Sequence, residues 1–529
     1  MSFVFPGALL GVVAVALPFL FAYTDAPVSN FWPMLASWAC AGVLLAAWAW
    51  RVRAEGAAGW APGNAPRAQR LAAGLLLAAL VAGAIGLAQY VVGDVGLQPW
   101  VHASQPGLAA GNLRQRNQQA TLLAMGAWAL LWWWLHRSPQ TGVGARSQGA
   151  KALLATPLAV AAVVFLAVAA AATASRTGAV QWALVLLLAV VWRRTGRGSS
   201  VLLAVLGLGV FLVAAWVLPE LLWRWQGVRA DALFHRFTDT SPACTSRRAL
   251  WSNMLTLISE KPWVGWGWGE LDYAHYVTLF PGDRFCVLLD NAHNLPLHLA
   301  VELGLPAAVL LCTAVAGWVL WSRPWREVRP ERQLAWGVLA LIGLHSMLEY
   351  PLWYGPFQLV ALFAVLVLAW PQVAAQRGQG PAHGGRAWPL AGLLGAAAVL
   401  VWGVCALAAW DYFRVSQLYK ANTARAVAYR DNVQAKVTRS VLFTCQLEFA
   451  QLTTTPLTRA NAPALNRMAK DLLHYSPEPR VIQVVIESAV MLGRDDEAAF
   501  HLKRYRLAYP KEYARWSAAA AQGASASAR

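Results

Sequence analysis

ALLATPLAVAAVVFLAVAAAA, residues 152–172, is the stretch that decides the fold of this chain. It carries no charged residue, and a helix of this length crosses the roughly 30 Å hydrocarbon core of a bilayer. Continuous apolar runs without period-two alternation predict helices rather than barrel strands. We therefore expect an all-α polytopic membrane protein with about eleven spans, at 3–22, 32–50, 71–91, 119–136, 152–172, 177–192, 199–217, 301–321, 334–348, 356–371 and 389–410.

The overall composition agrees with that class. Of the 529 residues, 58% are hydrophobic and 13% are charged, against roughly 25% charged in soluble domains. The net charge of +18 by itself suggests a nucleic-acid partner, but its distribution argues against one. Alternate loops collect the basic residues, at Arg51, Arg53, Arg67, Arg70, Arg137, Arg146, Lys151, Arg193, Arg194, Arg197, Arg323, Arg326, Arg329, Arg332, Arg377 and Arg386.

The short loops on the other side hold only Arg114, Arg116 and Arg176. This positive-inside asymmetry puts the N-terminus in the cytoplasm and, with eleven spans, the C-terminal segment outside. One helix more or fewer within 334–371 would move the C-terminus to the other side. The first residues, MSFVFPG, lack the positive region of a cleaved signal peptide, so we expect a retained first span or signal anchor.

The six cysteines divide by location. Cys244 and Cys286 lie in the long outer loop, where an oxidising periplasm would allow a disulfide that closes about 42 residues. Cys445 is an alternative partner. The sequence contains no C-x-x-C pair or Cys/His cluster, so we expect no metal site. The remaining cysteines lie inside predicted spans as small apolar residues: Cys40, Cys312 and Cys405.

The chain is expected to divide into a bundle of seven spans, a long periplasmic loop, four further spans and a helical tail, at 1–217, 218–300, 301–410 and 411–529. In the tail, a helix that ends near Gly493 and another that starts at Asp495 predict one helical hairpin. The composition of 518–529 predicts disorder.

The long loop contains RRALWSNMLTLISEKPWVGWGWGE at 247–270. Residues 251–258 have helical spacing of apolar side chains, so we expect an amphipathic helix on the membrane surface that Pro262 ends. The run WVGWGWG at 263–269 alternates tryptophan with glycine. It is typical either of an interfacial anchor or of a surface that binds sugar rings or a polyprenyl chain.

Three arginines stand out on the outer side, where basic residues are scarce. Arg176 lies in a short turn, and Arg247 and Arg248 begin the surface helix. The planar guanidinium binds phosphate oxygens bidentately, so arginines from separate loops could form a pyrophosphate clamp. Alternatively, Arg176 extends to the interface and pairs with a lipid phosphate.

His293, in DNAHNLPLHLAVELG at 290–304, begins an apolar helix on the outer face. A lone histidine there is either structural or a general base, since histidine titrates near pH 6.5. Asn291 and Asn294 flank it as candidate hydrogen-bond partners. Glu302 lies deeper on the same helix, and His298 is expected to point elsewhere.

These segments resemble the O-antigen ligase and polymerase superfamily. HNLPLHLAVELG at 293–304 is similar to its H-N-x-x-L-x-x-x-x-E-x-G motif. SRTG at 175–178, and the pair Arg247 and Trp251 followed by KPWVGWGWG, are similar to its other two signatures.

Further segments resemble one branch, the PglL-type protein O-oligosaccharyltransferases. GNLRQRNQQATLL at 111–123 is similar to a G-x-x-G-Q-P-N element, and HSMLEYPLWYGPF at 345–357 to H-S-x-x-E-Y-P-L-W-Y. In the tail, DYFRVSQLY at 411–419 and LLHYSPEP at 472–479 also resemble that branch. One departure is clear: Arg114 and Arg116 stand where the element has glycine and proline, so the loop is expected to differ in shape or charge.

The resemblance implies en bloc transfer of an oligosaccharide from undecaprenyl pyrophosphate to serine or threonine hydroxyls of periplasmic or pilin proteins, at the bacterial inner membrane. It implies no metal or other cofactor. By position, His293 would be the base, and Arg176 and Arg247, with Arg248 beside it, would hold the pyrophosphate. Substrate-site residues would be Gln115, Asn117, Asn294, Glu349, Tyr350 and Tyr354.

Two kinds of alternative remain open. The acceptor could be the lipid A core or another lipid-linked glycan, which would make the protein an O-antigen ligase or a polymerase. The protein could instead carry lipid-linked sugars across the membrane. Carriers place polar residues at mid-bilayer in broken helices, whereas the polar residues of this sequence gather on one face.

Overall fold

The computed structural model describes residues 6–55, 65–136, 145–193, 199–233, 243–369 and 387–527, and these residues form helices and turns with no β-strand. The basic residues Arg137, Arg194, Arg197, Arg377 and Arg386 of the predicted inner loops lie outside the described residues. Contacts divide the chain into two units. Unit 1 is Met1–Asp239 with Val319–Leu407, and unit 2 is Thr240–Trp318 with Ala408–Arg529.

The helices of unit 1 are α1 (Pro6–Leu20), α2 (Phe31–Glu55), α4 (Ala65–Val92), α5 (Arg116–Leu135), α6 (Ala145–Ala172), α7 (Arg176–Val191), α8 (Ser199–Gln226), η2 (Pro324–Arg326), α13 (Pro330–Ser346), η3 (Pro351–Trp353), α14 (Gly355–Ala369) and most of α15 (Ala387–Ser416). Each predicted span falls on a helix, the one at 301–321 on α12 of unit 2.

Five helices of the described chain are long and apolar enough to cross a membrane, at Phe31–Ala54, Pro66–Val92, Ser200–Gln226, Leu295–Arg326 and Pro389–Tyr419. Four more are apolar but shorter, at Leu9–Leu20, Thr156–Ala172, Arg176–Val191 and Gly355–Ala369. A helical membrane protein is therefore supported, and the count of eleven crossings stays a prediction.

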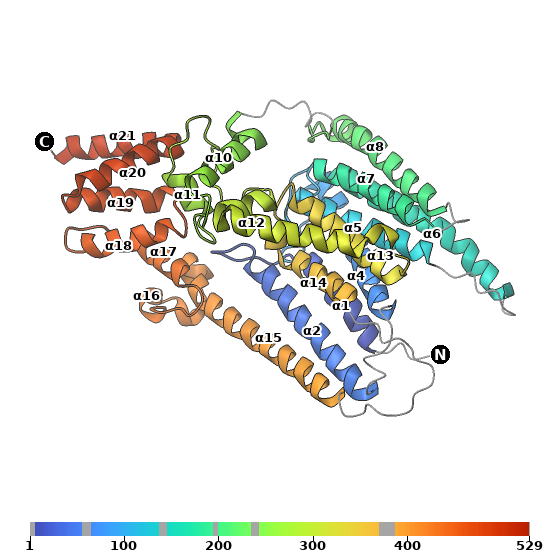
Figure 1. The fold of residues 1–529 in the computed structure, drawn as a ribbon. Coiled ribbons are helices and arrows are strands. Elements are labelled where there is room, and N and C mark those ends of the chain that lie inside the picture. The colour runs from blue at the N-terminus through green and yellow to red at the C-terminus, as the bar shows by residue number, and fades with distance from the viewer. Residues whose placement is uncertain are drawn as a thin grey trace. The chain divides into compact units, whose positions relative to one another are not determined.

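Helix α5 forms the centre of unit 1. It contacts α4, α6, α7, α8 and α13, and every residue from Gln118 to Trp132 is buried. Small residues permit this packing, because a Cβ on Gly126 would overlap Ala79 of α4. Trp128 donates its indole N–H to the Leu334 carbonyl of α13, 3.2 Å away. Figure 1 shows α4, α5 and α13 within this bundle. The polar residues at the start of α5 therefore belong to a helix that is closely packed along most of its length.

The helices of unit 2 are η1 (Ala243–Thr245), α10 (Arg247–Glu260), α11 (Leu271–Val277), α12 (Leu295–Ser322) up to Trp318, η5 (Gln417–Tyr419), η6 (Asn422–Ala424), η7 (Val427–Tyr429), α16 (Val433–Lys436), α17 (Thr444–Thr454), α18 (Ala462–Leu473), α19 (Pro479–Met491), α20 (Asp495–Ala508) and α21 (Pro510–Ser527). Most of α12 groups by contacts with the loop that precedes it, and the predicted division of the chain at residue 300 stays a prediction.

Helix α10 corresponds to the predicted amphipathic helix, but its environment differs from the prediction. Leu250, Met254 and Leu257 are fully buried, and they pack in one cluster with Leu289 and Val301. The apolar face is thus covered by protein rather than by lipid, because the segment before α12 and α12 itself supply the partner surface.

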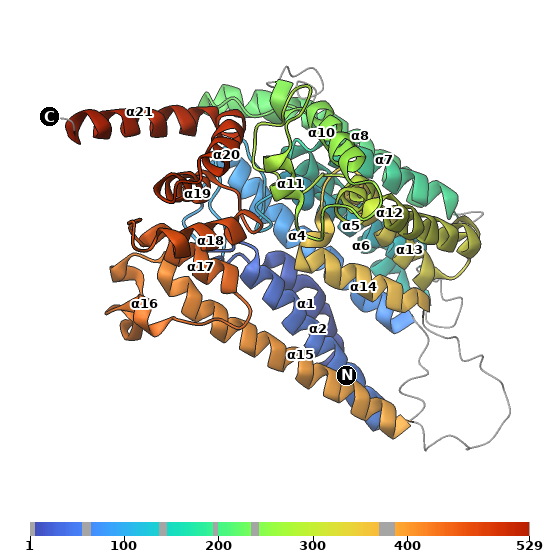
Figure 2. The ribbon, with the colours of Figure 1, turned by 60° about the vertical axis from the view of Figure 1, so that its left-hand side comes forward.

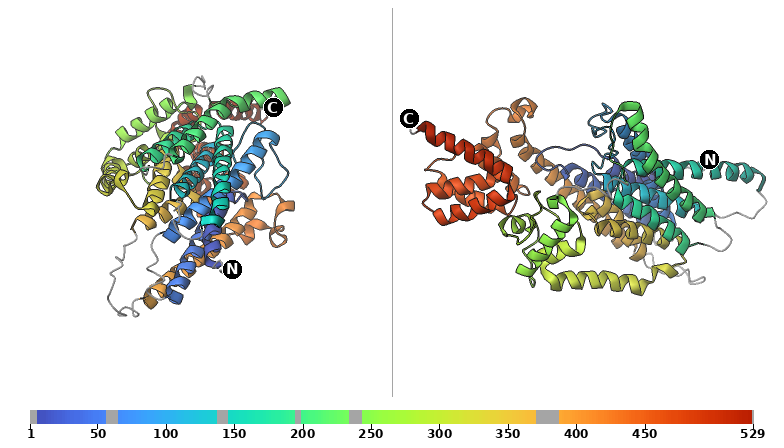
Figure 3. Two further views of the ribbon diagram at one scale, coloured as in Figure 1. Left: turned by 90° about the vertical axis from the view of Figure 1, so that its right-hand side faces the viewer. Right: turned by 90° about the horizontal axis from the view of Figure 1, so that it is seen from above.

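The tail consists of helices α17 to α21, each of which contacts the next, and Figures 2 and 3 show them together at the C-terminal end of the chain. Helix α19 ends before Gly493, whose φ is 69°, and α20 begins at Asp495, so the hairpin has the predicted ends. The Tyr276 hydroxyl of α11 and His501 Nδ1 of α20 share a 3.0 Å hydrogen bond, which ties the tail to the loop.

Helix α21 runs to Ser527, through most of the alanine-rich segment for which the composition predicted disorder. Alanine has the highest intrinsic helix propensity, and this accounts for the difference.

Candidate functional site

His293 lies at the entry to α12, in a turn that two asparagines hold. Its φ is 50°, a left-handed conformation that is uncommon for residues other than glycine. Asn291 Oδ1 accepts a 2.9 Å hydrogen bond from the His293 amide, and Asn294 Oδ1 accepts a 3.1 Å hydrogen bond from the Leu297 amide. The two asparagines thus hold the backbone that presents His293, in addition to starting the helix.

Arg247 and Arg248 open helix α10. Ser246 caps the helix by accepting a 3.1 Å hydrogen bond from the Ala249 amide, so Arg247 is the first helical residue. Arg247 is half-buried and Arg248 is exposed. A helix N-terminus presents unpaired N–H groups and favours anions, which makes this a suitable place for a phosphate.

A disulfide and one asparagine join α10 to the segment that leads to His293. Cys244 and Cys286 form a disulfide, whereas Cys445 is free and exposed. Asn253 of α10 donates to the Asp283 carbonyl at 2.9 Å and accepts from the Phe285 amide at 2.8 Å. Leu250 of α10 and Ala292, the neighbour of His293, lie in the same buried cluster. Arg247, the first residue of α10, and His293, which lies two residues before α12, are therefore next to helices that share one core.

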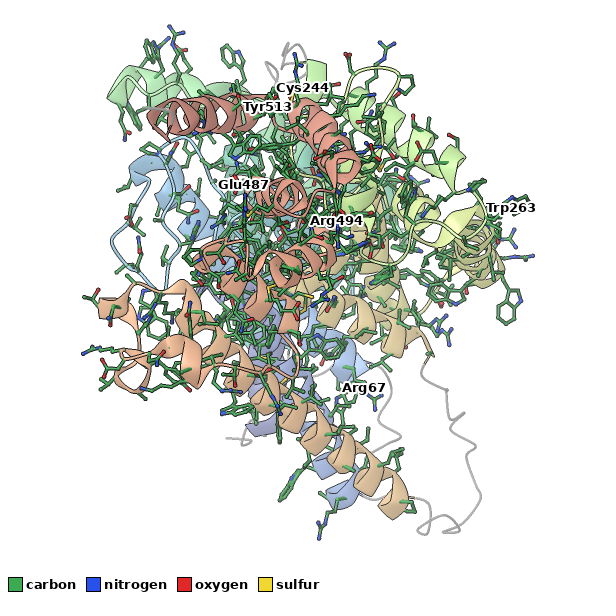
Figure 4. The ribbon with its side chains drawn as sticks, turned by 90° about the vertical axis from the view of Figure 1, so that its left-hand side faces the viewer. Arg67, Cys244, Trp263, Glu487, Arg494 and Tyr513 are labelled. Atoms are coloured by element: carbon green, nitrogen blue, oxygen red, sulfur yellow. A yellow bond between two sulfur atoms is a disulfide. The ribbon has the colours of Figure 1, made fainter. Side chains whose placement is uncertain are left out.

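Deeper along α12, His298 and Glu302 pair with each other. His298 Nε2 lies 3.3 Å from Glu302 Oε2, and both side chains are only 2% exposed. Helix α12 breaks at Gly304, where φ is 82°. The carbonyls of Val301 and Glu302 accept hydrogen bonds from the amides of Trp266 and Gly267, at 2.9 and 3.0 Å. The Trp-Gly run thus packs its backbone against the break, while the Trp263 side chain, 77% exposed, projects outward (Figure 4).

Unit 1 brings together several of the other predicted residues. Gln115 caps α5 by accepting a 2.8 Å hydrogen bond from the Gln118 amide. Asn117 donates to Glu349 Oε1 at 3.1 Å and accepts from the Ser175 hydroxyl at 2.6 Å. Ser175 in turn caps α7, whose first residue is the exposed Arg176. Side-chain hydrogen bonds of Asn117 thus join the start of α5 to Ser175 and to Glu349.

A second polar network, which the sequence did not lead us to predict, lies one turn further along α5, at Thr121. The Thr121 hydroxyl lies 2.9 Å from His345 Nδ1 and 2.9 Å from Gln181 Nε2, and Gln181 also donates to the Leu341 carbonyl. The signal was present in the sequence, because polar residues inside apolar spans are costly and usually functional. The caps Ser175 and Ser246 were also missed, although serine is a preferred N-cap residue.

The backbone at positions 114 and 116 is compatible with the glycine and proline of the resembled element. Arg114 has φ 61°, the left-handed conformation that glycine favours, and Arg116 is the first residue of α5, where proline is favoured. What changes is the charge. Arg114 Nη2 donates to Asn30 Oδ1 at 2.7 Å, and Arg116 forms a 2.7 Å ion pair with Asp231.

Tyr350 and Tyr354 stack with ring centroids 5.9 Å apart. Tyr354 and Arg114 line a small hollow between the end of α1, the start of α2 and the start of α14. Among the described residues, no group of three or more histidines, cysteines and acidic residues could hold a metal ion.

The predicted residues therefore fall into two sets. Unit 1 holds Gln115, Asn117, Arg176, Glu349, Tyr350 and Tyr354, and unit 2 holds Arg247, Arg248, His293 and Asn294.

Three family profiles match separate parts of the chain. The profile described as O-antigen ligase matches residues 161–312, which include Arg176, Arg247 and His293. The profile described as protein glycosylation ligase matches 109–134, and that described as virulence factor membrane-bound polymerase, C-terminal, matches 333–524.

One curated relative is a general O-oligosaccharyltransferase from Acinetobacter baylyi. It is 27% identical over 179 residues, which cover 34% of this chain and 29% of that relative. The match thus spans less than a third of the relative's length, and it is a match to part of that protein.

Proposed function

The chain belongs to the O-antigen ligase superfamily, in its PglL-type branch, and on that premise we propose that it transfers an oligosaccharide to protein hydroxyl groups. The donor is a glycan linked to undecaprenyl pyrophosphate, and the acceptor is a serine or threonine of a periplasmic or pilin protein. The reaction takes place on the periplasmic face of the bacterial inner membrane. The name of the Acinetobacter relative and the protein glycosylation ligase profile support a protein acceptor.

His293 acts as the general base in this proposal. It takes the proton of the acceptor hydroxyl, and the hydroxyl oxygen bonds to the anomeric carbon of the donor glycan. The bond between that carbon and the pyrophosphate oxygen breaks, and the oxygen keeps the electron pair. The observation that carries this role is the turn in which two asparagine caps hold His293 at φ 50°, since such backbone conformations cluster at functional sites.

Arg176, Arg247 and Arg248 bind the pyrophosphate and stabilise the charge that it gains on leaving. Support comes from a shared local geometry, because Arg176 and Arg247 are each the first residue of a serine-capped helix. The helix N-terminus adds its own positive potential to that of the guanidinium. No nucleotide is needed, because the pyrophosphate donor is already activated.

Substrate positioning falls to Gln115, Asn117, Asn294, Glu349, Tyr350 and Tyr354. Stacked tyrosines suit sugar rings, which present apolar C–H faces to aromatic side chains. The bonds of Asn117 to Glu349 and to Ser175 favour one fixed orientation of its amide.

The test is the variant His293→Ala in the full-length chain, assayed with a lipid-linked glycan and a periplasmic acceptor protein. We expect transfer to fall about 10²- to 10⁴-fold while the variant still folds and binds the donor. The matched control is His474→Gln, an exposed histidine of the tail that pairs with Glu270. Undiminished transfer by His293→Ala would remove His293 from the catalytic role.

Two of the matched profiles describe an O-antigen ligase and a polymerase, so the acceptor needs its own test. Mass spectrometry of periplasmic proteins, from cells with and without this gene, separates a protein acceptor from a lipid acceptor. Loss of glycopeptides in the deletion strain supports the proposal. Loss of glycan from lipid A core or shortened glycan chains, with unchanged glycopeptides, would contradict it.

A further inference from the structure

A buried carboxylate fixes the segment after α15 to the end of that helix. Asp411 is fully buried, and its Oδ1 pairs with Arg414 at 3.5 Å. Its Oδ2 accepts hydrogen bonds of 2.8 Å from the Ser440 hydroxyl and from the Val441 and Leu442 amides. The chain therefore leaves α15 and returns to its last turns at residues 440–442.

A small core holds the residues in between. Val415 of α15 packs in one buried cluster with Val433 and Val437, which lie in and next to the short helix α16. Figures 1 and 2 both show α16 near the end of α15. The exposed side chains of this segment are therefore presented by a folded structure with its own apolar interior.

Apolar side chains are exposed around this end of α15. Trp410 and Phe413 are 53% and 41% exposed, and Val441 and Leu442 are 65% and 50% exposed. The hydrogen bonds to Asp411 hold Val441 and Leu442 at the helix end that carries the two aromatic residues. Such a surface suits the boundary between lipid headgroups and acyl chains, where tryptophan is enriched and apolar side chains insert.

Helix α15 reaches that boundary at the same residues. It is one of the five described helices that are long and apolar enough to cross a membrane. The run 387–410 contains no charged residue, and Asp411 is the first. A run of this length spans the roughly 30 Å hydrocarbon core, so a crossing by α15 leaves Trp410 and the residues after it at the level of the headgroups.

Three exposed cations lie in the same segment, at Arg430, Lys436 and Arg439. Lys436 Nζ donates to the Ala428 carbonyl at 2.9 Å, and Arg430 Nε donates to the Arg425 carbonyl at 3.4 Å. These acceptors are neutral, and none of the three cations pairs with a carboxylate of the described chain. Their charges are therefore available to an anionic partner.

Arg439 connects the three cations to the apolar surface. Its carbonyl accepts a 3.3 Å hydrogen bond from Arg414 Nη2, and the Arg414 guanidinium lies 4.5 Å from the centre of the Trp410 ring. Cations beside an interfacial tryptophan match anionic headgroups, whose potential acts within about a Debye length of the bilayer. We propose that residues 410–442 bind anionic phospholipid, with the exposed apolar side chains in the interface and the three cations on headgroup phosphates.

This proposal goes beyond glycan transfer and requires only that α15 crosses the membrane. The test places the full-length protein in nanodiscs of phosphatidylglycerol or of phosphatidylcholine, without any glycan donor. Hydrogen–deuterium exchange of peptides from 420–445 is the local readout. We expect this exchange to be at least about threefold slower in phosphatidylglycerol, since each cation near an anionic surface strengthens binding about fivefold. Peptides from α19 serve as the internal reference.

The informative variant removes the three cations together, as Arg430→Gln, Lys436→Gln and Arg439→Gln. All three side chains are exposed, so we expect the protein to fold and the difference between the two lipids to disappear. The double variant Arg430→Lys and Arg439→Lys keeps the charges and is expected to keep the difference.

The matched control removes three exposed cations of α18 and α20, as Arg467→Gln, Lys503→Gln and Arg506→Gln. It changes the net charge by the same amount and is expected to keep the slower exchange in phosphatidylglycerol. Thermal unfolding of each variant in detergent reports on folding.

Three results would overturn the proposal. The first is equal exchange of the 420–445 peptides of the wild type in the two lipids, a comparison that needs no variant. The second is a lipid difference that survives the loss of the three cations, and the third is one that the control variant or the lysine variant also loses.

Discussion

The Ser175 hydroxyl donates a 2.6 Å hydrogen bond to Asn117 Oδ1 and accepts a 3.0 Å hydrogen bond from the Gly178 amide. One side chain thus caps α7 and orients an amide at the start of α5. Because Arg176 follows Ser175 directly, the position of the proposed pyrophosphate ligand depends on this bond.

Ser175→Ala is expected to lower the free energy of unfolding by about 1–2 kcal/mol, since it removes a cap and leaves the half-buried amide oxygen of Asn117 without this donor. Glycan transfer should also fall. The matched control is Ser200→Ala in α8, because the buried Ser200 hydroxyl makes no hydrogen bond to the described residues. Thermal unfolding and transfer assays test this, and equal effects of the two variants would argue against the role of Ser175.

Gly265→Ala is expected to destabilise unit 2 strongly, by more than about 2 kcal/mol. Gly265 has φ 70°, and an added Cβ would collide with the Glu302 carbonyl, where the Trp-Gly run meets the break in α12. Gly269→Ala is the matched control, because Gly269 has φ 81° but no atom within 4 Å of the added Cβ. Both variants place alanine at a left-handed backbone position, but only Gly265→Ala adds a steric collision. The difference between their thermal midpoints therefore reports the cost of the collision alone.

Replacing both Cys244 and Cys286 by serine is expected to destabilise the loop of unit 2. The bridge spans 42 residues, and closing a loop of this length restricts the unfolded chain by up to about 4 kcal/mol. Limited proteolysis of the segment between residues 243 and 293 should become faster, and Cys445→Ser should have no such effect. Unchanged proteolysis in the double variant would show that Asn253 and the buried cluster hold the loop without the disulfide.

Asp272 predicts a pH dependence of stability. Burial raises the pKa of its carboxyl from 3.8 to about 8, with a further contribution from Glu270 and Asp290. Between these pH values the folded state holds a proton that the unfolded state releases. Stability from this group is therefore complete below about pH 4 and is lost as the pH rises towards 8, by up to about 1.4 kcal/mol per pH unit.

Asp272→Asn removes this dependence, so its thermal midpoint should fall less than that of the wild type between pH 5 and pH 8. Asp431→Asn, at an exposed position of the tail, serves as the control. Parallel pH profiles for wild type and Asp272→Asn would show that the carboxyl ionises normally in the folded protein.

Much of the architecture could be predicted from local sequence. Runs such as 152–172 contain enough consecutive apolar residues to define helices, because helix formation and apolar patterning depend on neighbours in the chain. The helix boundary at Gly493 and Asp495 could be predicted for the same reason. Motifs singled out His293 and the arginines because their residue types and spacing are local properties.

Side-chain partners could not be predicted in this way. The bonds of Asn117 to Ser175 and Glu349 join residues that lie 58 and 232 positions apart, and nothing in their residue types selects those partners. The left-handed φ of Arg114 is rare for arginine, and the sign of it in the sequence was the glycine at this position of the resembled element.

The sequence by itself determined the helical class, the charge asymmetry and the residues that carry the family motifs, all of which depend on composition and spacing. Only the tertiary structure decided that α10 buries its apolar face in protein and that the carboxylate of Glu302 pairs with His298. It also decided that Arg114 lines a small hollow. These features depend on which surfaces meet once the helices pack, and packing selects among contacts that are equally compatible with the local sequence.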